Sequence, residues 1–224
     1  LKVLFGMLRS EDVAERLLAV TGFVSSPHPA AAPHLVSLLL DSDPGVRFRA
    51  RMVLDKLGWQ PDQSEAAGAY LAAAGRWDDC VKLGVKGIKG LSLALESTDK
   101  TVRNNALRAL ARIDDQAVVA PITAALKDYD GSVRSVAAEA LGKIGDEDAV
   151  PVLARALRDE HVAVRQNAAH ALGQIGGRQA IAALIRSGLS DKTKEVTGAV
   201  LAAIDLGGRP EHTSLILPLL QSDW

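Results

Sequence analysis

Histidines, the side chains that most often bind metals or transfer protons near neutral pH, are few in this sequence and irregularly spaced. The five are His28, His34, His161, His170 and His212. None follows the H-E-x-x-H spacing, which places two imidazoles on one face of a helix so that both reach a zinc ion. The sequence therefore predicts no metal site and no bound cofactor.

Three short stretches match fragments of catalytic or binding motifs. "STDK" at residues 97–100 has the S-x-x-K spacing, but no supporting motif accompanies it. "GVKGIKG" from Gly84 has the wrong spacing for a dinucleotide-binding turn, and no strand precedes it. "DYDG" from Asp128 lacks the rest of a calcium-binding loop. We interpret all three as chance matches.

Cys80 is the one cysteine, so no disulfide can form within the chain and a zinc site built from cysteines is disfavoured. Its neighbours Asp78 and Asp79 would raise the pKa of the thiol, because nearby negative charge disfavours the thiolate. We therefore expect a buried small residue rather than a nucleophile, and a chain that is not an enzyme. A lone cysteine also fits a reducing compartment, which predicts a cytoplasmic location.

Charge and hydropathy disfavour two further classes of protein. The 26 basic and 27 acidic side chains give a net charge of −1, whereas a nucleic-acid binder usually carries a basic excess that neutralises phosphates. No apolar run approaches the length of about 18 residues that a membrane span needs. We predict no membrane partner, and a nucleic-acid partner is disfavoured.

One sequence pattern recurs along the chain. "SVRSVAAEALGKIGD" from Ser132 is followed 31 residues later by "AVRQNAAHALGQIGG" from Ala163. The valine before the arginine recurs, without the arginine in the last copy and more weakly in the first, at Val13, Val46, Val102, Val133, Val164 and Val196. Apolar residues follow it after four, eight and eleven positions in most copies, which places one apolar stripe on a helix.

Another helix precedes each copy of this one, so the helix with the repeated valine is the second helix of each unit. The preceding helix ends on a leucine seven residues before the valine, at Leu39, Leu95, Leu126, Leu157 and Leu189. Asp43, Asp99 and Asp130 are placed to cap the following helix, and Gly145 and Gly176 suit a left-handed C-terminal cap. Each unit is thus a helical hairpin of about 31 residues whose apolar faces are buried only by stacking on neighbours. The pattern predicts a curved solenoid, which could be right-handed or left-handed.

The stretch "DGSVRSVAAEALGKIGDEDAVPVLARAL" from Asp130 to Leu157 resembles HEAT repeats of the phycobilisome-lyase (PBS-lyase HEAT-like) type. The resemblance covers most of the chain and weakens toward Val13 and Val196. It implies an all-α fold, a right-handed α-α superhelix of about six hairpins plus one inserted helix. Residues 1–224 would form a single array.

The regular spacing is interrupted at residues 58–84. Pro61 ends the preceding helix, Ser64 caps a new one that runs through Tyr70, and a short turn follows. We expect an added helix packed on the array, anchored by three aromatic residues, Trp59, Tyr70 and Trp77.

The array is expected to be truncated at both ends. The chain starts with Leu1 rather than methionine, and "PEHTSLILPLLQSDW" matches a first helix ending at Leu220 whose partner helix is missing. An open terminal repeat would allow end-to-end self-association.

Arginines and aspartates recur at fixed positions. The arginines are Arg47, Arg103, Arg134 and Arg165, and the aspartates are Asp41, Asp128, Asp159 and Asp191. By themselves the arginines could form an anion-binding row. The resemblance implies instead that arginines and aspartates pair as a ladder between adjacent repeats, a role that suits a planar guanidinium.

The resemblance also implies that the second helices line a concave surface. Positions two, three, six and ten after the repeated valine face away from the apolar stripe. In the first copy they are Glu15, Arg16, Ala19 and Phe23, and in the last three copies they include Glu139, Lys143, Gln174, Ala202 and Leu206. The predicted partner-binding residues are Phe48, Arg49, Met52, Asn105, Arg108, Arg112, Asn167 and His170.

Two of these residues have an alternative role. An exposed Phe48 and Met52 beside Arg49 would have the composition of a binding hot spot. Alternatively, Phe48 and Met52 pack under the inserted helix. The last copy has an apolar edge that includes Leu206, and we expect this edge to pack against C-terminal sequence that is missing from the chain.

The function that we predict is a non-catalytic scaffold or adaptor that binds a protein or peptide. The family name suggests an alternative, a subunit of a bilin lyase or isomerase. Nucleic-acid binding is the third hypothesis. The sequence identifies neither the partner nor the oligomeric state.

Overall fold

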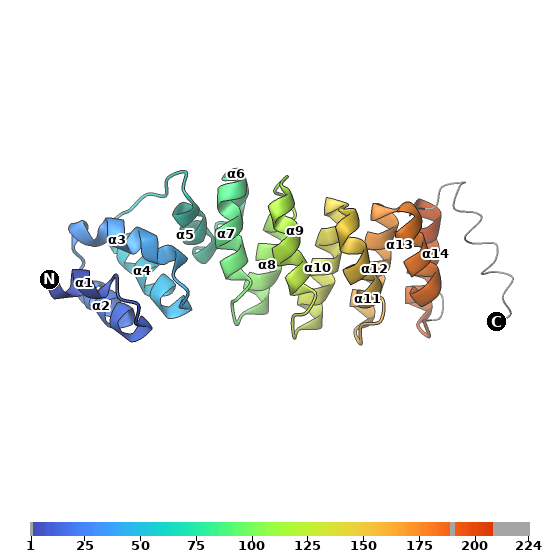
Figure 1. The fold of residues 1–224 in the computed structure, drawn as a ribbon, viewed down its shortest axis with the longest axis horizontal. Coiled ribbons are helices and arrows are strands. Elements are labelled where there is room, and N and C mark those ends of the chain that lie inside the picture. The colour runs from blue at the N-terminus through green and yellow to red at the C-terminus, as the bar shows by residue number, and fades with distance from the viewer. Residues whose placement is uncertain (1, 189–190, 208–224) are drawn as a thin grey trace, which may run out of the picture. The chain divides into compact units, whose positions relative to one another are not determined.

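The computed structural model describes residues 2–188 and 191–207. Within these ranges the chain forms helices and no strand (Figure 1), which confirms the predicted all-α fold. None of the described helices is long and apolar enough to cross a membrane. Contacts divide the chain into an N-terminal unit, Leu1–Glu96, and a C-terminal unit, Ser97–Trp224.

The N-terminal unit contains seven α-helices in its described residues, and short 3-10 turns flank α3. The helices are α1 (Lys2–Met7), α2 (Val13–Ser25), α3 (Ala32–Ser37), α4 (Pro44–Lys56), α5 (Glu65–Ala73), α6 (Trp77–Lys82) and α7 (Val85–Ala94). Helix α2 packs against α4, and their apolar side chains share one core that includes Phe23, Leu35 and Leu54. Helices α3 and α4 form a hairpin of the predicted kind.

The C-terminal unit carries the most regular repeats. Its described helices are α8 (Lys100–Leu110), α9 (Val119–Ala125), α10 (Gly131–Ile144), α11 (Val150–Ala156), α12 (Val162–Ile175), α13 (Gly177–Ala183) and α14 (Lys194–Gly207). A π-helical turn, Leu184–Gly188, extends α13. The second helices α8, α10, α12 and α14 pack directly against one another in chain order. The first helices α9, α11 and α13 each pack on the second helix of their own hairpin.

Polar caps define where the second helices begin and end. The side chains of Asp43, Asp99 and Asp130 accept hydrogen bonds from the backbone N–H of Val46, Thr101 and Ser132 respectively. Gly145 ends α10 with a φ of 75°, a left-handed conformation that glycine adopts without steric strain. These four predicted caps are confirmed, but the left-handed cap predicted at Gly176 is wrong, because its ψ of −158° lies outside the left-handed helical region.

The predicted register of the first repeat is wrong by two residues. Ala19 and Phe23, expected on the exposed face of α2, are 0% and 1% exposed. Glu15, not Val13, is the residue equivalent to the repeated valines, because Arg16 makes the loop contacts that arginines make in later repeats. Apolar residues occupy two adjacent stripes of α2, so periodicity alone did not distinguish the two registers.

The inserted segment contributes a layer of the stack rather than an addition to its surface. Ser64 caps α5 as predicted, since its hydroxyl accepts a hydrogen bond from the backbone N–H of Ala67 at 3.2 Å. Helix α5 packs on α3 and α4 and also on α7, and most of its residues are buried. Trp59 and Tyr70 meet edge to face at 5.1 Å between ring centroids.

The predicted turn at residues 76–84 is largely the short helix α6, which begins at Trp77 and buries Cys80. Burial, with a smaller contribution from Asp79, raises the pKa of the Cys80 thiol to about 12. Cys80 is thus a buried small residue, as expected. The predicted helix ends at Leu189 and Leu220, and the C-terminal segment that contains Leu220, lie outside the described residues.

Candidate protein-binding surface

Each regular loop between helices is tied to the next repeat by an arginine. The Nε and Nη2 atoms of Arg103 donate to the two carboxylate oxygens of Asp128 at 2.8 and 2.9 Å. Its Nη1 atom donates to the carbonyl oxygens of Ser97 and Thr98 in its own loop. The ring of Tyr129 lies 4.5 Å from the guanidinium carbon and covers it. One guanidinium therefore joins two loops and is 2% exposed.

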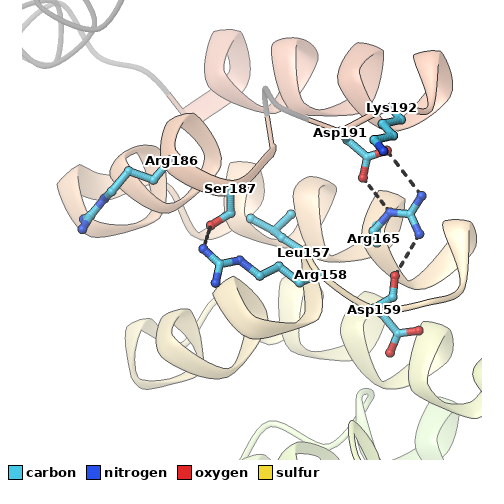
Figure 2. Close-up of a pocket in the computed structure, with 8 residues that line it drawn as sticks. All are labelled: Leu157, Arg158, Asp159, Arg165, Arg186, Ser187, Asp191 and Lys192. Carbon is cyan, nitrogen blue, oxygen red and sulfur yellow. Dashed lines mark hydrogen bonds and ion pairs between the residues drawn. The ribbon is translucent and has the colours of Figure 1, made fainter.

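The same contacts recur in the following repeats. Arg134 donates to both carboxylate oxygens of Asp159, and Arg165 donates to both oxygens of Asp191. Figure 2 shows Arg165 between the Asp191 carboxylate and the carbonyl oxygen of Asp159. These contacts occupy most of the guanidinium donors, which disfavours an anion-binding row at these positions.

The N-terminal unit departs from the predicted pairing. Asp41 accepts both hydrogen bonds from Arg16, a residue that was expected on the exposed face. Arg47 keeps the two carbonyl contacts of its loop but pairs with Glu96 at 2.7 Å, not with an aspartate. The inserted layer separates Arg47 from the next regular loop, so its partner lies 49 rather than about 25 residues along the chain.

Asp159 and Asp191 make the C-terminal unit sensitive to acid. Burial by itself would raise the pKa of Asp159, but hydrogen bonds from Arg134 and from the His161 backbone outweigh it and hold that pKa below its usual value. Burial opposes ionisation of Asp191 in the same way, and Arg165 holds its pKa low. The ionised carboxylates therefore stabilise the folded state above the ordinary aspartate pKa.

We expect this stabilisation to be lost as the pH falls below about 4 and through the lowered folded-state pKa values. The urea midpoint, followed by circular dichroism, should fall between pH 7 and pH 3. The double substitution Asp159→Asn/Asp191→Asn should lower the midpoint at pH 7 and reduce its change with pH. If the urea midpoint of this variant changed with pH as much as that of the native chain, the assignment of the acid sensitivity to Asp159 and Asp191 would be contradicted.

The second helices of the C-terminal unit enclose a groove of about 430 Å³. We call it the second-helix groove. The residues other than alanine that line it are Glu139, Lys143, Asn167, His170, Gln174 and Leu206. Its floor is alanine, at Ala171, Ala202 and Ala203.

Small residues bring the helices beneath this groove close together. A Cβ atom on Gly142 would lie 2.7 Å from the Cα of Ala171, and one on Gly173 would lie 2.7 Å from the Cα of Ala203. Helices α10, α12 and α14 therefore touch through their backbones at these points. The longer side chains that line the second-helix groove therefore lie on both sides of its alanine floor.

The side chains around the second-helix groove differ in how tightly they are held. Lys143 donates to Glu139 at 2.6 Å on the same helix. Asn167 donates to the hydroxyl and the carbonyl oxygen of Ser135, so its amide joins α12 to α10. His170 is exposed, and Leu206 is 70% exposed. An apolar side chain and an exposed imidazole thus border the groove without covering it.

A second cavity of about 360 Å³ adjoins the second-helix groove and shares Lys143 with it. Arg112 lines this cavity together with three carboxylates, those of Asp114, Asp115 and Asp146. The structure therefore places three of the predicted residues, Arg112, Asn167 and His170, along two adjoining cavities.

The other predicted partner residues lie elsewhere. Asn105 is half-buried and Arg108 is exposed on α8, and neither lines the two cavities. Phe48, Arg49 and Met52 belong to α4 of the N-terminal unit. Phe48 is 55% exposed, so the alternative that it packs under the inserted helix is wrong. Arg49 donates to the carbonyl oxygen of Gly45 within its own helix.

Sequence reasoning missed most of the groove. Glu139, Lys143, Gln174, Ala202 and Leu206 line it but were absent from the predicted site. All five stand six or ten residues after the repeated valine. A rule that kept only these two positions in consecutive repeats would have selected them.

No metal-binding arrangement is present in the described part of the chain. Among residues 2–188 and 191–207, no group of three or more histidine, cysteine, aspartate or glutamate side chains could hold a metal ion.

Comparisons with known proteins indicate the repeat type. A family model described as HEAT repeats matches residues 88–162 and 143–205, which together span more than half of the chain. A search of curated proteins finds no significant match.

Several solved structures are similar. Human deoxyhypusine hydroxylase in complex with glycerol is 23% identical over 91% of this chain and 83% of that chain, with a TM-score of 0.49. Computationally designed armadillo repeat proteins for modular peptide recognition are 21% identical over 92% of this chain and 98% of that chain, with a TM-score of 0.48. An engineered protein is 24% identical over 92% and 94%, with a TM-score of 0.43.

Proposed function

Because the chain belongs to the family of HEAT repeats, we propose that it is a non-catalytic scaffold that binds a protein or peptide along its second helices. Repeat proteins of this architecture present extended surfaces made of equivalent positions in successive units. The observation that carries the proposal is the second-helix groove, which is about 430 Å³ in volume and whose lining includes the positions six and ten residues after the repeated valine in three repeats.

The composition of the groove indicates the kind of segment that it would hold. Alanines form its floor and Leu206 stands exposed at its border, which suits an apolar side chain of the partner. The side chains of His170 and Gln174 offer hydrogen bonds, and the Lys143–Glu139 pair offers both charges. These features support a peptide with an apolar anchor between polar residues rather than a phosphate chain.

The substitution Ala202→Arg tests the proposal, because Ala202 lines the groove and is itself exposed. A long side chain there fills the groove without disturbing the core. Leu201→Arg is the matched control: it adds the same charge to the same helix at a neighbouring residue that is 56% exposed and outside the groove. Both variants should first show the native melting curve.

We expect proteins captured from a lysate by the native chain to be lost with Ala202→Arg and retained with Leu201→Arg. For a segment mapped from such a partner, Ala202→Arg should weaken binding at least about tenfold, which corresponds to about 1.4 kcal/mol. Equal binding by both variants would contradict a site in this groove. Loss with Phe48→Ala/Met52→Ala alone would place the site in the N-terminal unit instead.

The same protein samples test the two other functions. Visible absorbance that stays with the chain after mixing with a bilin would favour a lyase or isomerase subunit. Salt-sensitive binding of an oligonucleotide would favour a nucleic-acid binder.

A further inference from the structure

The first helices of the C-terminal unit carry a second concave surface that differs in charge from the second-helix groove. A cavity of about 630 Å³ opens between α11 and α13 with its π-helical extension. An adjoining cavity of about 350 Å³ shares Arg158, Arg186 and Ser187 with it. We call the larger cavity the cationic groove. It is lined chiefly by Pro151, Ala154, Arg158, Arg178, Ala182 and Arg186.

The positive charge of this groove is not neutralised within the described residues. Arg158, Arg178 and Arg186, with Lys192 in the adjoining cavity, form no ion pair with any described residue. The carboxylates of Asp159 and Asp191, which line the adjoining cavity, are already paired with other arginines. A chain whose net charge is −1 therefore gathers three arginines and a lysine on one short surface.

The arginines are held at the borders of the groove by weak polar contacts. Arg158 donates to the hydroxyl of Ser187 at 3.3 Å, and the Nε atom of Arg186 donates to the carbonyl oxygen of Ala182 at 3.3 Å. In Figure 2 both guanidinium groups lie away from the paired Arg165. Each keeps donors that can bind a carboxylate in the bidentate geometry that guanidinium favours.

The spacing of the groove matches an extended peptide. Arg178, Ala182 and Arg186 are four residues apart, so they follow one face of a continuous helical segment. Eight residues of helix span about 12 Å. In an extended chain, residues i and i+4 lie about 13 Å apart and point to the same side. Carboxylates at i and i+4 could therefore meet Arg178 and Arg186, with residue i+2 above the alanines.

We propose that the cationic groove binds an acidic segment of a partner protein, with acidic residues at i and i+4 and an apolar residue at i+2. The floor of Ala154, Ala182 and Ala183 gives the apolar residue a place, which a bare phosphate would not use. Among the described residues, no aromatic side chain lines the groove for a base to stack on, and stacking is the usual means of holding single-stranded nucleic acid. The proposal does not rest on the proposed function, because it concerns the other helices of each hairpin.

The probe is a fluorescein-labelled peptide with the central sequence Glu-Ser-Leu-Ser-Glu, measured by fluorescence anisotropy with the full chain. Arg178→Glu/Arg186→Glu reverses both charges that face the peptide. Arg155→Glu/Lys194→Glu makes the same change in net charge at exposed residues of the same unit that do not line the groove. Ala202→Arg reports separately on the second-helix groove.

We expect saturable binding that weakens at least tenfold with Arg178→Glu/Arg186→Glu and less than about twofold with Arg155→Glu/Lys194→Glu. Replacing the central leucine of the peptide by serine should also weaken binding. Equal loss with both double variants, or no binding at low ionic strength, would overturn the proposal. So would full competition by inorganic phosphate, or tighter binding of a single-stranded oligonucleotide of the same charge. Unchanged binding by Ala202→Arg would show that this result is independent of the second-helix groove.

Discussion

Replacing Arg103 with alanine is expected to lower the free energy of unfolding by about 3–5 kcal/mol, the usual effect of removing one partner of a buried ion pair. Arg103 is 2% exposed, and its guanidinium donates to Asp128 and to two loop carbonyl oxygens. Its removal leaves a partly buried carboxylate without a counter-charge and takes a hydrogen-bond donor from each carbonyl group, of which Thr98 keeps the Tyr129 hydroxyl. Urea denaturation followed by circular dichroism measures the loss.

Two further substitutions make this result specific. Arg108→Ala removes an exposed arginine from the same helix and should change stability by no more than about 0.5 kcal/mol. Arg103→Lys keeps the charge but not the fork of donors, and should recover only part of the loss. Equal stability of Arg103→Ala and Arg108→Ala would contradict the role assigned to the pairing between repeats.

The substitution Gly90→Ala is expected to destabilise the N-terminal unit by about 1–3 kcal/mol, the usual effect of overpacking. A Cβ atom on Gly90 would lie 2.3 Å from the carbonyl carbon and oxygen of Gly68 and 2.4 Å from the backbone nitrogen of Ala69. Backbone atoms cannot rotate away as a side chain can, so α5 and α7 would have to separate. Trp59 and Trp77 lie in this unit, and their fluorescence reports its unfolding in urea.

Gly6→Ala is the matched control, because Gly6 also lies within a helix of this unit. Apart from its chain neighbours and the backbone of its own helix, no described atom lies within 4 Å of the Cβ that this change would add. Alanine is the better helix former by about 1 kcal/mol, so this variant should be as stable as the native chain or more stable. If Gly90→Ala were also stabilising, the close approach of α5 and α7 would be wrong.

Most of the fold could be predicted because the helices of each repeat are determined by residues close together in the sequence. Apolar residues at helical spacing, aspartate caps and the left-handed Gly145 depend on neighbours within one or two turns. Repetition then compensates for weak signals in any one copy. The first copy shows the limit of this reasoning, since α2 carries two apolar stripes and only contacts with α4 determine which one is buried.

The candidate sites were less predictable, because they depend on distances between residues of different repeats. The pairing of Arg47 with Glu96 across an inserted layer has no local signature. The second-helix groove arises where Gly142 and Gly173 bring helices together, and the cationic groove arises where α11 and α13 leave space between their arginines. Lists of exposed residues do not contain these distances.

The amino-acid sequence by itself thus determined the all-α repeat architecture, the hairpin length and most helix ends, since these follow from local propensity and periodic burial. Only the tertiary structure decided that the inserted helix is a layer of the stack, which arginine meets which acid, and where the surface is hollow. Stacking brings together residues 25 or more positions apart, and the shape between them depends on how closely two backbones can approach.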